Sequence, residues 1–196
     1  LKFDIDVTAI TKQGDALKVK FSDGTSLNCD TVMYATGRHP LTADLGLEAC
    51  GVALDDNQAI VVDQRYQTNI ASIYAIGDVT NRVNLTPVAL AEGMSLAWDL
   101  YSDDAKQVDY EFIPSAVFSQ PSLATVGYTE AQAREKFAAI TVFRTSFTSL
   151  KHTMSGSDEK MFMKLIVDAS NDRVIGVHMV GPDAGETIQG IAIALK

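Results

Sequence analysis

Cysteine and histidine are scarce in this chain of 196 residues, which has two of the former and three of the latter. Cys29 and Cys50 match neither a C-x-x-C redox pair nor a zinc-ligand spacing, so we expect both to be structural. His39, His152 and His178 are scattered, with no partner at metal-ligand spacing. These absences argue against a metal centre.

An excess of positive charge and long apolar runs are also missing. The chain carries 16 Lys and Arg against 25 Asp and Glu, a formal net charge of −9. Nucleic-acid binding needs clustered cations that neutralise phosphates, so this balance argues against such a partner. No apolar run is long enough to span a membrane, and no basic-then-apolar leader opens the sequence. With 46% hydrophobic residues, we expect a soluble, cytoplasmic globular protein without a membrane or nucleic-acid partner.

Both ends look like interrupted elements. Residues 1–7 already alternate like a strand, and there is no initiator Met. Lys196 closes a strongly apolar helix without a Gly cap or another stop signal. We therefore expect a fragment of a longer protein.

The first third of the chain reads mostly as strands. Three alternating segments over residues 3–29, separated by hairpin-type turns, predict an antiparallel meander. The apolar run of residues 31–35 enters Thr36-Gly37-Arg38-His39-Pro40, where Gly and Pro would switch the chain out of the sheet. We expect a domain crossover near Gly37, and a further short strand over residues 60–63.

A stretch from Thr68 to Asp78 has the pattern of a ligand-binding strand end. Residues 72–76 form a short apolar run typical of a strand buried on both faces, and Gly77 lets a ligand approach the backbone. In an open α/β sheet the carboxyl end of such a strand borders the ligand crevice. Asp78 could accept hydrogen bonds there from sugar or ribitol hydroxyls.

A helix start follows at Leu85-Thr86-Pro87-Val88-Ala89. Thr86 can cap the helix with Pro87 at its first position. Free backbone N–H groups and the positive dipole end would then face the same crevice and favour electron-rich oxygens. Alone, either motif is also an ordinary turn or helix start, so their combination carries the interpretation.

Apolar spacing predicts this helix over residues 87–101, with one buried face: Val88, Ala91, Leu96 and Leu100.

The remaining chain predicts a separate domain. Residues 102–109 are typical of a linker, and residues 115–119 of a strand. Thr129 with Gln132 could form a capping box for a short helix over residues 131–137. Residues 161–167 and 174–180 predict a hairpin. Asp183 with Glu186 should cap a last helix, which belongs in a core or a subunit contact because it is apolar around most of its circumference: Ile188, Ile191, Ile193 and Leu195.

The pattern T-x-x-x-x-x-Y-A-x-G-D over residues 68–78, with L-T-P-x-A shortly after, resembles the flavin- and nicotinamide-dependent disulfide reductases. The resemblance to this pyridine nucleotide-disulfide oxidoreductase family runs along essentially all of the chain. It implies an α/β and α+β fold in three parts. Residues 1–36 would end an NADPH-binding domain, residues 37–109 would be the C-terminal part of a Rossmann-like FAD-binding domain, and residues 110–196 would begin an α+β dimerisation domain.

The resemblance also assigns cofactor contacts. Asp78 matches the family aspartate that contacts the flavin ribitol, and Thr86 matches the threonine beside the flavin pyrimidine oxygens. Without the family, Asn84 is an ordinary loop residue and Ala116 an ordinary strand residue. The implied FAD contacts are Asp78, Leu85, Thr86 and Pro87, and the implied NADPH contacts are Gly37, Asn84, Ala116 and Phe118.

Within the family, residues 81–90, 116–121 and 190–196 look most like the glutathione reductases, and trypanothione reductases share much of this pattern. This implies a homodimeric oxidoreductase that uses FAD and NADPH to reduce glutathione disulfide; a dihydrolipoyl or trypanothione reductase is the alternative. Met94 occupies a position where many glutathione reductases have an arginine that binds a substrate carboxylate. A thioether cannot form that ion pair.

No catalytic residue is expected in the chain itself. In the family, the G-x-G-x-x-G loop and the C-x-x-x-x-C redox-active centre lie upstream, and the acid–base His-Glu couple lies just downstream of Lys196. None of the histidines present has the family's H-P-T context. The segment by itself is therefore expected to be inactive, and a non-catalytic dimerisation module with a partial flavin surface is the alternative from another class.

Overall fold

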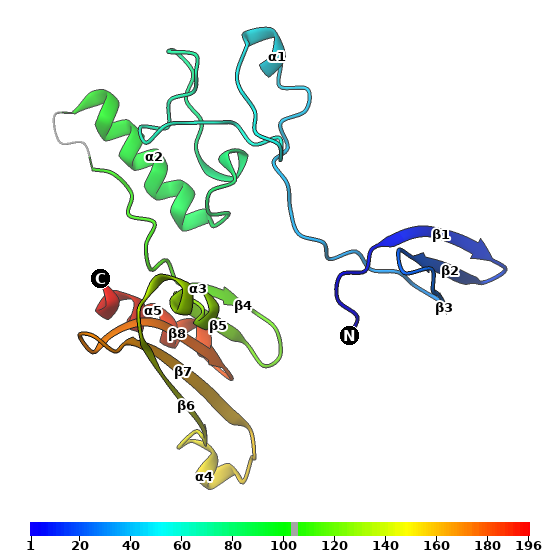
Figure 1. The fold of residues 1–196 in the computed structure, drawn as a ribbon, viewed down its shortest axis with the longest axis vertical. Coiled ribbons are helices and arrows are strands. Elements are labelled where there is room, and N and C mark those ends of the chain that lie inside the picture. Colours follow the sequence, from blue (N-terminus) through cyan, green and yellow to red (C-terminus); the bar gives the residue numbers. More distant parts are fainter. Residues whose placement is uncertain (103–105) are drawn as a thin grey trace. The chain divides into compact units, whose positions relative to one another are not determined.

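The computed structural model describes residues 1–102 and 106–196. Two compact units are present, Leu1–Gln107 and Val108–Lys196 (Figure 1). The predicted linker over residues 102–109 lies partly outside the described residues. Within the described ranges, no helix combines the length and the apolar character that a membrane crossing requires.

The N-terminal meander is confirmed. Strands β1 (Val7–Gln13), β2 (Ala16–Phe21) and β3 (Ser26–Cys29) form a three-stranded antiparallel sheet in that order (Figure 1). The strand predicted over residues 1–7 is wrong, because β1 begins only at Val7. Asp4 has a left-handed backbone with φ of 56°, which interrupts an extended chain.

Three other predicted strands do not form. Residues 72–76 contribute only the isolated bridge Gln67↔Tyr74, and residues 60–63 only the bridge Leu54↔Ile60. Residues 31–35 belong to no strand. A strand needs a hydrogen-bonded neighbour, and these apolar runs meet no ladder within the described part of the chain. Ile60 and Ala75 are buried, whereas Met33 and Tyr34 are 84% and 61% exposed. Apolar character therefore predicted neither the pairing nor a uniform burial of these runs.

Helix α2 (Thr86–Tyr101) is the long helix of the first unit, which also contains α1 (Leu47–Cys50). The short 3-10 helix η1 (Gly77–Thr80) packs against α2. The predicted apolar face of α2 is only partly confirmed, since Val88 is buried and Leu96 half-buried, whereas Ala91 and Leu100 are exposed. The residues that α2 buries are Val88, Glu92 and Ser95.

The second unit is an α+β arrangement around one antiparallel sheet of order β4-β5-β8-β7-β6 (Figure 1). The hairpin predicted over residues 161–180 is confirmed, and so is the Thr129–Gln132 capping box. Short loops and local side-chain bonds specify both, which is why the sequence predicts them well. The elements are β4 (Ser115–Val117), β5 (Leu123–Gly127), α3 (Glu130–Lys136), β6 (Ile140–Thr148), α4 (His152–Ser155), β7 (Lys160–Asp168), β8 (Arg173–Val180) and α5 (Ala184–Leu195).

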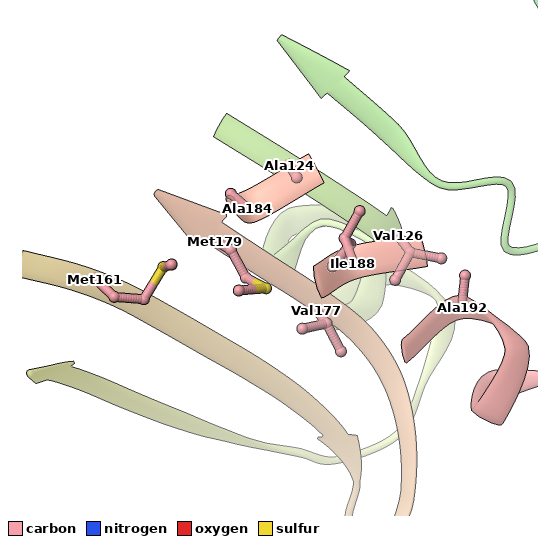
Figure 2. Close-up of a cluster of buried hydrophobic side chains, with 8 residues drawn as sticks. All are labelled: Ala124, Val126, Met161, Val177, Met179, Ala184, Ile188 and Ala192. Atoms are coloured by element: carbon pink, nitrogen blue, oxygen red, sulfur yellow. The ribbon is translucent and has the colours of Figure 1, made fainter. Parts of the chain in front are cut away.

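The main core lies between α5 and strands β5, β7 and β8. Figure 2 shows side chains of α5 directed at those of β5 and β8. Ile188 is 1% exposed, and burying such a side chain contributes about 1.5–3 kcal/mol. Ile193 on the same helix is 76% exposed in the single chain, so one face of α5 is in the core as predicted, and the other is left to the subunit contact that the sequence analysis gives as the alternative. The buried members of this cluster are Ala124, Val126, Met161, Val177, Met179, Ala184, Ile188 and Ala192.

The predicted side-chain cap of α5 is wrong. Asp183 is the N-cap residue, but its backbone is left-handed, with φ of 58°, and its side chain makes no cap hydrogen bond. The Asp183 carboxylate instead lies 3.3 Å from Lys151 Nζ. A left-handed N-cap differs from the extended backbone from which a capping side chain reaches the first turn.

A row of polar side chains crosses the sheet on the face opposite α5. The register pairs Thr125 with His178, His178 with Lys164, and Lys164 with Arg144. Glu130 from α3 bonds Lys164 Nζ at 3.0 Å and an Arg144 guanidinium nitrogen at 2.6 Å. Hydrogen bonds from Arg134, Lys164 and Arg144 lower the pKa of Glu130 to about 2.

His178 is held as a neutral imidazole in this row. Its Nδ1 lies 2.6 Å from Thr125 Oγ1, and its Nε2 lies 3.1 Å from the Tyr128 carbonyl oxygen. Burial, and then the charge of Lys164, lower the pKa of His178 below 6.5, while the bond to the Tyr128 carbonyl raises it. The net lowering means that the folded state resists protonation.

This lowering predicts a pH dependence of stability. An unfolded chain binds a proton at this histidine below about pH 6.5, so the contribution is present above that pH and is lost on acidification. The urea midpoint of the chain should fall between about pH 7.5 and pH 5.5, and should fall less in His178→Gln. His39→Gln, at an exposed position, is the control and should behave as the native chain. An equal fall of the urea midpoint in all three proteins would contradict the lowered pKa of His178.

Candidate functional site

Gly77, the first residue of η1, lies where the two predicted ligand-binding segments contact each other. Its backbone has φ of 70°, and a Cβ built there would lie 3.2 Å from the Ala89 Cβ of α2. Glycine alone meets both conditions without strain. The Gly77 N–H donates to Glu92 Oε2 at 2.6 Å, and its carbonyl accepts from Thr80 Oγ1 at 2.8 Å. Both backbone polar groups of Gly77 are therefore satisfied from within the unit.

Asp78 follows directly and points its carboxylate to solvent. The side chain is 53% exposed and lies 3.9 Å from an Arg38 guanidinium nitrogen. A loose ion pair at such exposure contributes little, at most about 1 kcal/mol. The carboxylate can therefore exchange this contact for hydrogen bonds from a ligand.

The opening turn of α2 differs from the prediction in one respect. Leu85, with extended backbone angles of φ −131° and ψ 131°, is the N-cap residue, and no side chain caps the helix. Thr86 and Pro87 are instead the first two helical residues, so the predicted Thr86 cap is wrong. The Leu85 carbonyl accepts from the N–H groups of Val88 and Ala89 at 3.0 and 3.1 Å, which closes the first turn without a hydroxyl.

This helix end has the electrostatics of an acceptor-binding site. Thr86 and Pro87 are exposed, and the first turn contains no acidic residue. The positive end of the helix dipole is thus uncompensated by its own side chains. Oxygens that carry partial negative charge are the natural ligands of such an end.

The loop between η1 and α2 connects the two groups. Asn81 N–H donates to the Asp78 carbonyl at 3.1 Å, and Asn84 Nδ2 donates to Asn81 Oδ1 at 3.2 Å. Asp78, Asn84 and Thr86 therefore lie on one locally bonded segment. The other predicted NADPH residues, Ala116 and Phe118, belong to the second unit, on β4 and just after it; Phe118 is 87% exposed.

Met94 lies further along α2 on an exposed apolar stripe. Leu90, Met94 and Trp98 recur every four residues and are 67%, 53% and 40% exposed. Residues at this spacing share one face of a helix. The sequence of α2 contains neither Lys nor Arg, so this helix itself offers no cation to a substrate carboxylate.

Glu92, which is buried and bonded to Gly77, is the residue beside this site that the sequence interpretation missed. It was not assigned because an acidic residue in an amphipathic helix is usually solvated. A signal was nevertheless present, since Val88, Glu92 and Ser95 follow the spacing of one face and all three are buried.

The geometry fits a flavin. An exposed carboxylate beside Gly77 can accept hydrogen bonds from hydroxyls, such as those of a ribitol chain, and the uncapped end of α2 suits the pyrimidine oxygens of an isoalloxazine ring. Two clefts of about 520 and 450 Å³ lie elsewhere, the first around residues 39–48 and the second beside α5. Neither is lined by a predicted site residue. The described residues contain no cluster of His, Cys, Asp and Glu suited to a metal ion.

Comparisons with known proteins cover nearly the whole chain. Residues 1–93 match the family "Pyridine nucleotide-disulphide oxidoreductase", and residues 113–196 match its dimerisation domain. The chain is 48% identical over its full length to a glutathione reductase of Burkholderia cepacia and spans 44% of that protein. It is 50% identical over 96% of its length to a chloroplastic/mitochondrial glutathione reductase of Pisum sativum, spanning 34% of it. The chain thus spans under half of these relatives.

A trypanothione reductase of Trypanosoma congolense is 43% identical over 91% of the chain, which covers 36% of that protein. Among solved structures, the HOCl-induced flavoprotein disulfide reductase RclA of Escherichia coli is similar with a TM-score of 0.85 and 30% identity. That match covers 97% of this chain and 44% of RclA. The predicted fold class is confirmed by the two family domains and the mixed helices and sheets. With both of its units matched by domains of one family, the chain belongs to the pyridine nucleotide-disulphide oxidoreductases.

Proposed function

We propose that the parent protein of this chain is a cytoplasmic, homodimeric, FAD-dependent disulfide reductase that uses NADPH to reduce glutathione disulfide. The observation that carries the proposal is the junction of η1 with α2, which bonds the Asp78 segment to the helix that Thr86 opens. The similarity to glutathione reductases along the whole chain supports the same assignment.

The FAD contacts would come from Asp78, Leu85, Thr86 and Pro87. Asp78 would accept a hydrogen bond from a ribitol hydroxyl. The α2 end would stabilise negative charge on the ring oxygens by about 0.3–1 kcal/mol, up to ~2 when partly buried. Bound FAD would supply the redox chemistry, taking a hydride from NADPH and passing on the electron pair. Gly37, Asn84, Ala116 and Phe118 are proposed NADPH contacts.

The proposed domain boundaries are 1–36 for the end of the NADPH domain, 37–109 for the FAD domain and 110–196 for the dimerisation domain. The division of the structure between Gln107 and Val108 supports the second boundary. The match of residues 113–196 to a dimerisation domain supports the homodimer.

The redox cysteines and the acid–base histidine would lie in parts of the parent outside this chain. Cys29 and Cys50 are both free thiols here, half-buried and exposed respectively. Thiol–disulfide exchange needs a second sulfur within bonding reach of the attacking thiolate. We propose that the chain by itself does not catalyse.

Trypanothione disulfide is a second candidate substrate. Met94 and the absence of cations on α2 favour it, because the usual arginine for a glutathione carboxylate is missing. The trypanothione reductase relative is nearly as similar to this chain as the glutathione reductases are.

We predict that Asp78→Ala weakens FAD binding by the full-length parent. Loss of a hydrogen bond to a charged acceptor costs about 1.5–3 kcal/mol, equivalent to roughly a 10- to 150-fold rise in the dissociation constant. Titration of apoprotein with FAD, followed by flavin fluorescence, measures it. Asp56→Ala, at another exposed aspartate of the same unit, should leave the constant unchanged. Equal affinities for native protein and Asp78→Ala would contradict the assigned contact.

Substrate choice is tested by NADPH oxidation with full-length parent and each disulfide. We expect turnover with glutathione disulfide, and a Michaelis constant that falls about 1.4- to fivefold in Met94→Arg, because an exposed ion pair of about 0.2–1 kcal/mol is gained. Met94→Gln, which adds no charge, should leave the constant near the native one. Turnover with trypanothione disulfide alone would assign the second candidate, and turnover with neither would reject the proposed function.

A further inference from the structure

Glu92 is a buried carboxylate that the proposed reaction does not use. Its residue is 1% exposed, and it lies on α2 between the apolar Val88 and the buried Ser95. A carboxylate taken out of water is costly unless it is hydrogen-bonded. The short 2.6 Å bond from the Gly77 N–H is such a compensation.

The backbones of η1 and α2 approach closely on both sides of this bond. A Cβ at Gly77 would lie 3.2 Å from the Ala89 Cβ, and a Cβ at Gly93 would lie 3.3 Å from Ile76 Cδ1. Glu92 therefore closes a contact that two glycines make possible. The Gly77–Glu92 hydrogen bond and the packing together restrain Gly77, the residue that precedes Asp78.

We infer that Glu92 is a positioning residue of the flavin site. Its carboxylate fixes the Gly77 peptide against α2, and through it the direction in which the Asp78 carboxylate faces relative to the first turn of the helix. Glu92 acts through Gly77 and touches no reacting atom. The inference rests on the proposed function, since it concerns the same FAD surface.

Three substitutions of Glu92 test separately the length of its side chain, its charge and its ability to accept a hydrogen bond. Gln at position 92 keeps the length and an acceptor oxygen but removes the charge. Asp keeps the charge but is one methylene shorter, so it cannot span the distance to Gly77 from the same backbone. Leu keeps a similar volume but accepts no hydrogen bond, which leaves the Gly77 N–H without this acceptor.

The test measures the FAD dissociation constant of full-length parent apoprotein by flavin fluorescence. We expect Glu92→Leu and Glu92→Asp to raise it about tenfold, the effect of an unmade bond to a buried donor. Glu92→Gln should rescue binding to within about twofold of native. Ser95→Ala is the control, because it removes another buried polar group of α2, one that donates to the Lys106 carbonyl. It should leave the FAD dissociation constant at the native value.

Thermal unfolding of each variant, measured alongside, separates positioning from general stability. Rescue by Gln but not by Asp supports positioning, and this comparison holds even if the Leu variant fails to fold. Native FAD affinity in Glu92→Asp or Glu92→Leu, with only the melting temperature lowered, would overturn the inference while leaving the proposed function intact. A native parent that binds no FAD would overturn both.

Discussion

The hydrogen bond from the Gly77 N–H to the Glu92 carboxylate is the interaction on which the candidate site depends. This bond attaches η1 to α2. With it, a carboxylate that faces solvent at Asp78 and a helix end without a capping side chain are parts of one bonded surface. One ligand can therefore meet a negative carboxylate and a positive helix end together. A flavin can bind the first with its hydroxyls and the second with its ring oxygens.

The second unit is organised by a different constraint. α5 covers one face of the sheet with an apolar core, whereas the other face carries a polar row that ends at Glu130. Charged side chains in that row are paired, and His178 is neutral because burial lowers its pKa. The apolar face supplies most of the stability and the polar row makes it depend on pH. The match to a dimerisation domain agrees with exposed Ile193 on α5.

Local signals in the sequence predicted what local interactions determine. The Thr129–Gln132 capping box and the β7–β8 hairpin are specified by residues a few positions apart, and both are present. The strand predicted over residues 72–76 failed because pairing depends on a partner that the apolar pattern does not encode. η1, which begins with Gly77-Asp78, packs against α2, which begins after Leu85. The sequence did not indicate the Gly77–Glu92 bond between them, because burial of an acid reverses its usual preference.

The most direct test of this account is a crystal structure of the full-length protein with FAD bound. The account predicts an Asp78 carboxylate oxygen within hydrogen-bonding distance of a ribitol hydroxyl, the first turn of α2 beside the pyrimidine oxygens, and the Glu92–Gly77 bond intact. A flavin bound away from both groups, or an Asp78 side chain turned from the α2 end with no ligand between them, would contradict it.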